Sequence, residues 1–177
     1  MGTESTPTRG AGVQMIPSGK TNVMRVLDSL GIAYESHFYE ADASLSGEEV
    51  AALLGEDADG VFKTLVTQGK SGQHYVFVIP VREELDLKKA AKVSGEKAIV
   101  MIKQKELLPL TGYIHGGCSP IGMKKPFPSF LDETAELFDT VCVSAGKVGA
   151  QVELSPQDLI RAAELTTADL VADDRDA

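Results

Sequence analysis

The chain has 177 residues, 43% of them hydrophobic, and a net charge of −9, values that fit one globular domain with short tails. No apolar run approaches the roughly 20 residues of a membrane-spanning helix, and the negative charge argues against bulk DNA binding through a uniformly basic surface. Because the N-terminus lacks the apolar core of a signal peptide and two cysteines are too few for a disulfide framework, we expect a cytoplasmic protein.

Residues 1–20 are rich in Thr, Pro, Gly and Ser and predict a disordered tail. A helix is predicted next, because apolar residues recur at helical spacing before a capping glycine: Val23, Val26, Leu27, Leu30 and Gly31. The alternation over 33–40 predicts a strand. Ser46 and Glu49 then form a capping-box pattern for a second helix, which Gly55 ends.

Two β-rich runs at 61–68 and 74–80 are joined by a glycine-containing turn and predict a hairpin. Asp86 is placed to cap a short helix that runs through Lys92. The remaining elements are predicted as a strand at 97–102, a short helix ending near Leu108, strands at 113–115, 128–131, 140–144 and 151–154, and a helix begun by Ser155-Pro156.

Strands and helices do not alternate regularly in this pattern. This argues against a doubly wound fold and for a mixed sheet or a barrel that carries helices outside it. The folded domain is predicted at 21–172, followed by a fraying acidic tail at 173–177. Neither G-x-G-x-x-G nor a Walker A motif is present, and the three histidines show no metal-ligand spacing, so we expect no cofactor and no metal.

Lys63 is the most informative single residue. Strand alternation places Val61, Lys63 and Leu65 on one face and apolar residues on the other, as in a strand covered on both sides. One interpretation is a lysine that extends along its stem to solvent at a sheet edge. The other is a cation that meets a phosphate or a carbonyl oxygen in a cleft.

A glycine-rich run covers 116–122, and a smaller one covers 144–149. Such loops allow a ligand to approach backbone amides, which are suitable donors to a polarised carbonyl, although tight bends between strands have the same composition. Cys118 lies in the first run, but it lacks an evident activating partner, because period-2 counting places His115 on the opposite face. We do not expect Cys118 to be a nucleophile.

Positive charge is concentrated in one part of this acidic chain. Between Leu85 and Lys125 there are eight lysines and three acidic residues. The residue pattern alone favours ordinary solvated lysines, and the alternative is a local phosphate-contacting face.

Several short motifs occur in a specific order and spacing: V-F-K-T-L at 61–65, L-D-L-K-K at 85–89, T-G-Y at 111–113, G-G-C-S-P-I-G at 116–122, K-K at 124–125 and S-A-G-K-V-G at 144–149. With them, the chain resembles the YbaK family, which is related to the editing domain inserted in bacterial prolyl-tRNA synthetases. The similarity extends over about residues 21–172. The resemblance implies an α/β fold of the α+β type, with a mixed, barrel-like sheet and helices packed outside it. It also implies a trans-editing deacylase that removes cysteine mischarged on tRNA(Pro).

The resemblance also implies site residues. Lys63 falls on the family's essential lysine, and Tyr39 falls on a tyrosine near the pocket. The G-x-x-x-P loop that cradles the aminoacyl group contributes Gly116, Gly117, Ser119 and Pro120, and the loop opposite contributes Ser144 and Gly146. Two departures are Gln151, where many relatives carry aspartate, and the lack of an aromatic residue near Leu45.

The mechanism implied by the family needs no base, metal or cofactor from the protein. The thiol of the substrate cysteine attacks its own ester carbonyl, and the protein supplies orientation and hydrogen-bond donors. The expected partner is aminoacyl-tRNA, namely Cys-tRNA(Pro), with prolyl-tRNA synthetase as a candidate second partner. The alternatives are a non-catalytic tRNA- or synthetase-binding module of the same fold and an editing enzyme for another small amino acid.

Overall fold

The computed structural model describes residues 19–173. The tails predicted at 1–20 and 173–177 lie outside these residues, except for Gly19, Lys20 and Asp173. None of the helices within this range has the length and apolarity needed to cross a bilayer.

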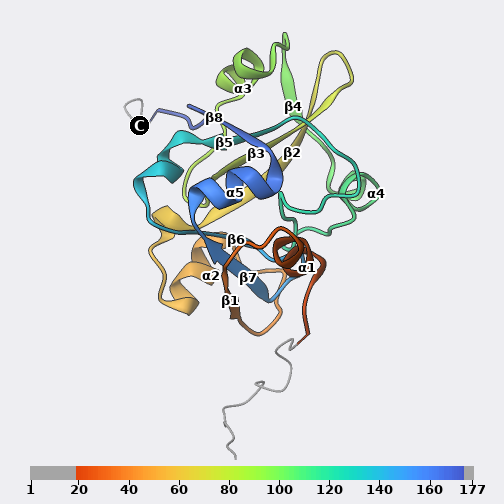
Figure 1. Ribbon diagram of the computed structural model, residues 1–177. Helices are drawn as coiled ribbons and strands as arrows, with labels where there is room; N and C mark the ends of the chain where they lie inside the picture. Colours follow the sequence, from red (N-terminus) through yellow and green to blue (C-terminus); the bar gives the residue numbers. More distant parts are fainter. Residues whose placement is uncertain (1–18, 174–177) are drawn as a thin grey trace, which may run out of the picture.

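The strands form two sheets (Figure 1). The small sheet is antiparallel and has the order β1-β7-β6, with β1 at Glu35–Phe38, β7 at Ala150–Leu154 and β6 at Val141–Ser144. The large sheet has the order β4-β2-β3-β5-β8, with β4 at Ile99–Met101, β2 at Phe62–Gly69, β3 at His74–Pro80, β5 at Ser129–Asp132 and β8 at Leu165–Ala168. β2 pairs antiparallel with β3 and β4, whereas β5 is parallel to both β3 and β8.

The expected mixed α/β architecture is confirmed, but the barrel-like closure is not found. The two sheets are joined between β2 and β6 only by a single parallel bridge between Val61 and Cys142. They instead pack face to face, and the main core lies between them. Val76 and Val78 of β3 meet Val143 of β6 and Val152 of β7 in this layer.

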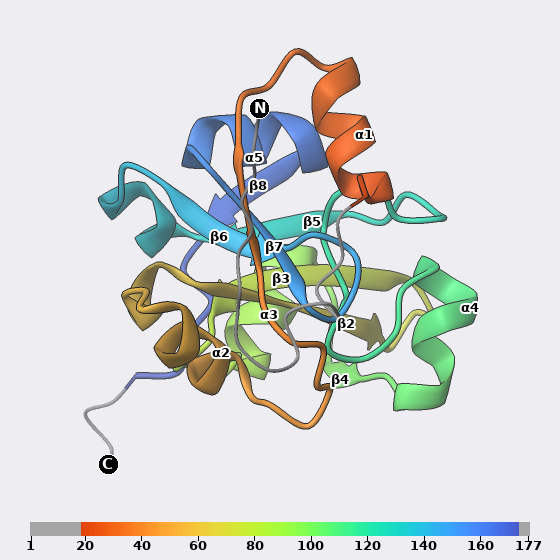
Figure 2. The same ribbon diagram turned by 90° about the horizontal axis from the view of Figure 1, so that it is seen from below.

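Five α-helices surround the sheets: α1 at Asn22–Ser29, α2 at Gly47–Leu54, α3 at Leu87–Ser94, α4 at Leu107–Thr111 and α5 at Pro156–Ala163. α1 and α5 lie side by side at one edge of the sheets (Figure 2), where Arg161 donates a hydrogen bond to the Leu30 carbonyl at 3.3 Å. α3 covers the outer face of the large sheet with Ala90 and Ala91. α2 lies over the outer face of the small sheet, and Ala51 packs against Val61 and Cys142 there.

The predicted helix starts are confirmed, because each depends on a local side-chain bond. The Ser46 hydroxyl accepts from the Glu49 amide, and the Glu49 carboxylate accepts from the Ser46 amide. Asp86 caps α3, and Ser155 caps α5 with Pro156 in its first turn.

One predicted strand is absent, and one strand was not predicted. Residues 113–115 form no strand, because their backbone bonds are satisfied locally: the Thr111 hydroxyl accepts from the Tyr113 amide at 3.0 Å, and the Gly117 amide closes a turn on the Ile114 carbonyl at 3.0 Å. β8 was not predicted. It follows Glu164, whose φ of 54° reverses the chain at the end of α5 without the glycine that usually marks this conformation.

Candidate functional site

A cavity of about 400 Å³ opens between α2, the start of β2, the loop that contains Gly116 and the small sheet. Its wall consists of Tyr39, Asp42, Leu45, Ser46, Gly47, Val50, Val61, Phe62, Lys63, Thr64, Leu65, Val81, Leu107, His115, Gly116, Cys118, Ser144 and Gln151. The wall is largely apolar, with a few polar groups from segments far apart in the chain. This is the usual character of a small-molecule site.

Lys63 is the only lysine or arginine in the wall. It is the second residue of β2, opposite Ile79 in the hairpin, and it is half-buried. No hydrogen-bond or ion-pair partner of its ammonium group is found between residues 19 and 173. A half-buried cation without an internal partner is suited to an anionic or carbonyl group that comes from outside the protein.

The two glycine-rich loops, predicted separately, lie directly against each other. A Cβ atom on Gly117 would lie 2.9 Å from backbone atoms of Lys147 and Val148, so only glycine fits there. Gly116 has a φ of 88°, a left-handed conformation that also favours glycine. The backbone N–H groups of Gly116 and Cys118 have no acceptor among the described residues, so two wall residues offer unused amide donors.

Four of the eight predicted site residues line the cavity: Lys63, Tyr39, Gly116 and Ser144. Burial raises the pKa of the Tyr39 phenol, which therefore stays a neutral hydroxyl at physiological pH. The Ser144 hydroxyl accepts a hydrogen bond from the Gly146 amide at 3.1 Å. This contact shapes the loop at the cavity wall.

The other four lie behind the wall or away from it. The Gly117 amide is bonded to Ile114, and the fully buried Ser119 hydroxyl accepts from the Ile121 amide at 3.3 Å. Gly146 has a φ of 94° and approaches the Tyr113 ring, whereas Pro120 lines a second hollow of about 470 Å³ near the end of α5. These positions support the loops that form the cavity. Their role as direct substrate contacts stays a prediction.

Cys118 and His115 both line the cavity, so the strand-based expectation that they face apart was wrong. The segment between them is a turn and not a strand, which removes the period-2 alternation. Burial raises the pKa of the Cys118 thiol to about 12. A thiol with this pKa is protonated at neutral pH and is a poor nucleophile.

Two further wall residues were missed in the sequence. Asp42 is the only carboxylate in the wall, and hydrogen bonds from the Ser44 hydroxyl and amide lower its pKa, so it is charged at neutral pH. Thr64 Oγ1 is buried without a hydrogen-bond partner within residues 19–173. The sequence signal that could have identified Thr64 was its neighbour Lys63. The cavity surrounds the start of β2 and reaches both faces of the strand, so adjacent residues both line it.

Gln151 and Leu45, the two positions of departure from the family pattern, both lie in the cavity wall. With the amide of Gln151 oriented so that its nitrogen faces Glu56, the nitrogen donates to Oε2 at 2.8 Å and to Oε1 at 3.2 Å. Glu56 lies behind the wall beside His37 and Cys142, a grouping with the donor types of a metal site. Sequence spacing did not reveal it, because the three residues are far apart in the chain.

Comparison with known proteins identifies the family. A sequence profile of the aminoacyl-tRNA editing domain matches residues 41–162. The chain belongs to the aminoacyl-tRNA editing domain family. It is 47% identical over 154 residues to EbsC of Enterococcus faecalis, a proposed Cys-tRNA(Pro)/Cys-tRNA(Cys) deacylase, and the match covers 84% of this chain and 94% of EbsC.

More distant similarities were found to one further sequence and to solved structures. A proline–tRNA ligase of Shouchella clausii is 28% identical over 102 residues, which cover 58% of this chain and 18% of the ligase. The crystal structure of a proposed trans-editing enzyme for prolyl-tRNA synthetase superposes with a TM-score of 0.74 at 25% identity, covering 88% of this chain and all of that one. A solved hypothetical protein has a TM-score of 0.78 at 24% identity and supports the fold alone.

Proposed function

We propose that this protein is a trans-acting deacylase that removes cysteine mischarged on tRNA(Pro). The observation that carries the proposal is Lys63, a half-buried and unpartnered cation in a small cavity that also presents free backbone amides. The 47% identical relative and the editing-domain profile support the same reaction class.

The polar groups of the wall assign a place to each part of an aminoacyl ester. Lys63 is the candidate partner of the ester or of the terminal tRNA phosphate, and the Gly116 and Cys118 amides are candidate donors to the carbonyl oxygen. The α-ammonium group of the substrate would pair with Asp42, the only carboxylate of the wall. Tyr39 and Ser144 complete the pocket around the small side chain.

Within the described residues, the wall contains no thiolate nucleophile, because the Cys118 thiol is protonated. The substrate thiol is therefore the proposed nucleophile. Its sulfur bonds to the ester carbonyl carbon, the bond from that carbon to the ribose oxygen breaks, and the thiol proton passes to the ribose oxygen. The products are free tRNA and a cyclic cysteine thioester, which water then opens. Fixing the two groups in attack geometry can lower the barrier by up to ~7–11 kcal/mol.

The tRNA itself needs cationic contacts outside the cavity. Lys105 lies in the short helix η3 (Gln104–Glu106), and Lys103 directly precedes this helix. The wall residue Leu107 follows it. The α3 lysines lie on the outer face of the large sheet, and Lys89 is paired there with Asp169 and Asp173. We therefore assign the tRNA contact to the η3 side of the predicted basic segment. Prolyl-tRNA synthetase is the proposed source of the mischarged tRNA.

The test compares tRNA(Pro) charged with cysteine, serine or S-methylcysteine under single-turnover conditions. Cys-tRNA should be cleared far faster than the other two, because a free thiol is a few per cent thiolate near neutral pH whereas a hydroxyl is not ionised. The cyclic thioester should be detectable by rapid quench and mass spectrometry. Equal rates for all three would show that water is the nucleophile, and no turnover of any of them would identify a binding module.

A further inference from the structure

The outer face of the small sheet carries a line of polar side chains. In the register of this sheet Cys142 is opposite Glu153, and His37 is opposite Gln151, so these four side chains point to the same side. The alternate residues, such as Val152, point into the core. Glu56 reaches over the polar side from the segment that follows α2.

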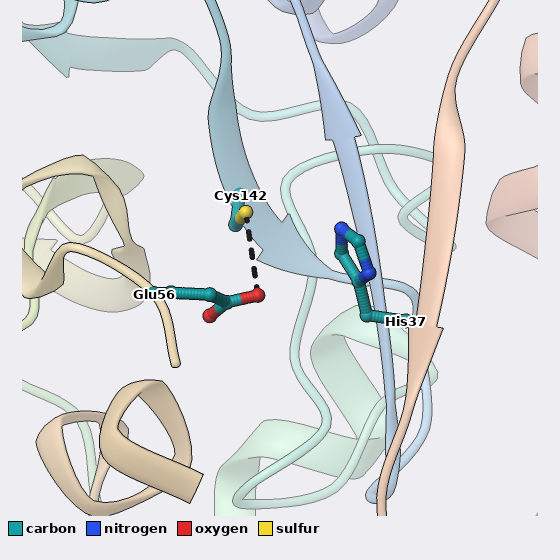
Figure 3. A group of neighbouring side chains, drawn as sticks. All are labelled: His37, Glu56 and Cys142. Atoms are coloured by element: carbon teal, nitrogen blue, oxygen red, sulfur yellow. Dashed lines mark hydrogen bonds between the residues drawn. The ribbon is translucent and has the colours of Figure 1, made fainter. Parts of the chain in front are cut away.

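Three of these groups converge. A ring nitrogen of His37, a carboxylate oxygen of Glu56 and the sulfur of Cys142 all lie within 4.8 Å of one another. The Cys142 thiol donates to Glu56 Oε2 at 3.7 Å, and the His37 ring lies beside these two side chains (Figure 3). Cys142 is buried, and the other two are partly buried. The cluster is thus shielded and made by three separate elements.

We propose that His37, Glu56 and Cys142 form a binding site for a divalent transition-metal ion, with Zn²⁺ as the best fit. One thiolate, one imidazole and one carboxylate are the ligand types that Zn²⁺ prefers, and three protein ligands leave one position for water. The site lies behind the cavity wall and is separate from the ester-binding residues assigned above.

The geometry requires only small adjustments. Zinc–ligand bonds of about 2.0–2.3 Å place tetrahedral donor atoms roughly 3.3–3.8 Å apart. The 3.7 Å between Cys142 Sγ and Glu56 Oε2 is already in this range. The three donor atoms lie within 4.8 Å of one another, so closing to this range requires rotation of the Glu56 side chain, which enters from a loop, and a shift of the His37 ring toward Cys142.

Charge around the cluster favours a cation. Glu35 and Glu153 flank His37 in addition to Glu56. Burial and these carboxylates together raise the pKa of the Cys142 thiol. Coordination would replace the thiol proton, which is released to solvent, and the charges of one thiolate and one carboxylate would balance the ion.

Glu153 is the neighbouring group that a bound ion must accommodate. Its Oε1 lies 2.7 Å from His37 Nε2, and its second oxygen accepts from the Thr140 hydroxyl. An ion at Nε2 would displace this contact or take Glu153 as a further ligand, whereas an ion at Nδ1 would leave Glu153 as the outer carboxylate that fixes the ring. Glu35, His37 and Glu153 also form a second possible donor set, which lacks sulfur.

The experiment titrates the full-length chain, purified without a histidine tag and freed of metal, with Co²⁺ and then Zn²⁺. We expect one ion per chain, a thiolate-to-cobalt charge-transfer band, displacement of Co²⁺ by Zn²⁺ and release of protons. Cys142→Ser should remove the band and weaken Zn²⁺ binding by about 100-fold or more, beyond the 10–100-fold typical for loss of an outer partner.

Cys118→Ser is the matched control, because this second thiol lies in the cavity wall, and it should bind like the parent. His37→Asn provides a second ligand variant in case Cys142→Ser unfolds, as judged by circular dichroism. Absence of binding, or binding that persists unchanged without Cys142 and weakens with Glu35→Gln, would overturn the proposal. Because no tRNA is used, this result is independent of the deacylase assay.

Discussion

The cavity and the His37–Glu56–Cys142 cluster are neighbouring regions that differ in whether their polar groups have hydrogen-bond partners within the protein. In the cavity Lys63, the hydroxyl of Thr64 and two backbone amides lack internal partners among the described residues. In the cluster, Glu56 accepts from the Cys142 thiol, and His37 is bonded to Glu153. Gln151 lies between them, with Glu56 on one side and the cavity on the other.

Because of this difference, the two regions are suited to two different kinds of ligand. The buried Thr64 hydroxyl, which has no partner in the described range, costs free energy until a ligand supplies one. Lys63 and the two amides are more accessible and are available to bind polar groups of a substrate. The paired groups of the cluster are satisfied by protons that a metal ion can replace. Substitutions on the two sides should therefore affect different measurements.

The largest expected effect follows from removal of the cavity cation. Lys63→Ala should reduce single-turnover deacylation of Cys-tRNA(Pro) by about 100-fold or more, since a positioned donor at the reacting group is lost. Lys70→Ala, at the exposed hairpin turn, is the matched control and should be neutral. Near-normal turnover by a folded Lys63→Ala protein would contradict the assignment of Lys63 as the partner of the ester or of the terminal tRNA phosphate.

The next prediction concerns the rates at which the two cysteine thiols are alkylated. The Cys118 thiol has a pKa of about 12, raised by burial, so its alkylation by iodoacetamide at pH 8 should be about 100-fold slower than that of an ordinary thiol. The rate should keep increasing above pH 9 and not level off. Peptide mapping of each cysteine, with and without denaturant, measures this. Fast alkylation of Cys118 in the native protein would show that its thiol is reactive and would make it a candidate nucleophile.

A smaller effect is expected for the carboxylate at the rim. Asp42→Asn should raise KM for Cys-tRNA(Pro) severalfold with little change in kcat, because an exposed ion pair with the substrate ammonium contributes modestly. Glu48→Gln on the nearby α2 surface, outside the wall, serves as the control. Equal effects of the two changes would indicate a general loss of charge and not a specific contact.

The smallest predicted change concerns Thr64. Thr64→Val keeps the shape but removes a buried hydroxyl without a partner in the described range, so the free energy of unfolding should stay constant or rise by up to about 1 kcal/mol. Deacylation should decrease at the same time if the substrate supplies the missing bond. Denaturant unfolding and single-turnover rates, measured on one preparation, separate the two. A marked loss of stability would indicate an internal partner.

Local signals were sufficient for much of the fold. The capping box of Ser46 and Glu49 and the glycine at position 55 set α2 through bonds within a few residues. The short β8 strand was missed because the chain reverses at Glu164 and no glycine there marks the end of α5. The closure of the sheet depends on how two sheets pack, and a one-dimensional alternation pattern carries no information on that.

Half of the predicted site residues line the cavity, and residues in segments without a recognised motif were missed. Lys63 was found through its apolar neighbours, and the structure places it in the cavity wall. Asp42 lies in an irregular segment without periodicity, so no pattern assigned it to the cavity. The convergence of His37, Glu56 and Cys142 depends on strand register across β1, β7 and β6 and could not be read from spacing.

The contact at Gly117 has a consequence for any attempt to redesign this enzyme. Since there is no room for one carbon atom between Gly117 and the backbone of Lys147 and Val148, neither loop can shift here without displacing the other. Lengthening or exchanging one loop alone would force the other out of place. Variants with altered amino-acid selectivity should therefore arise by paired changes in both loops, or by substitutions in the segment before α2, where Leu45 lines the cavity.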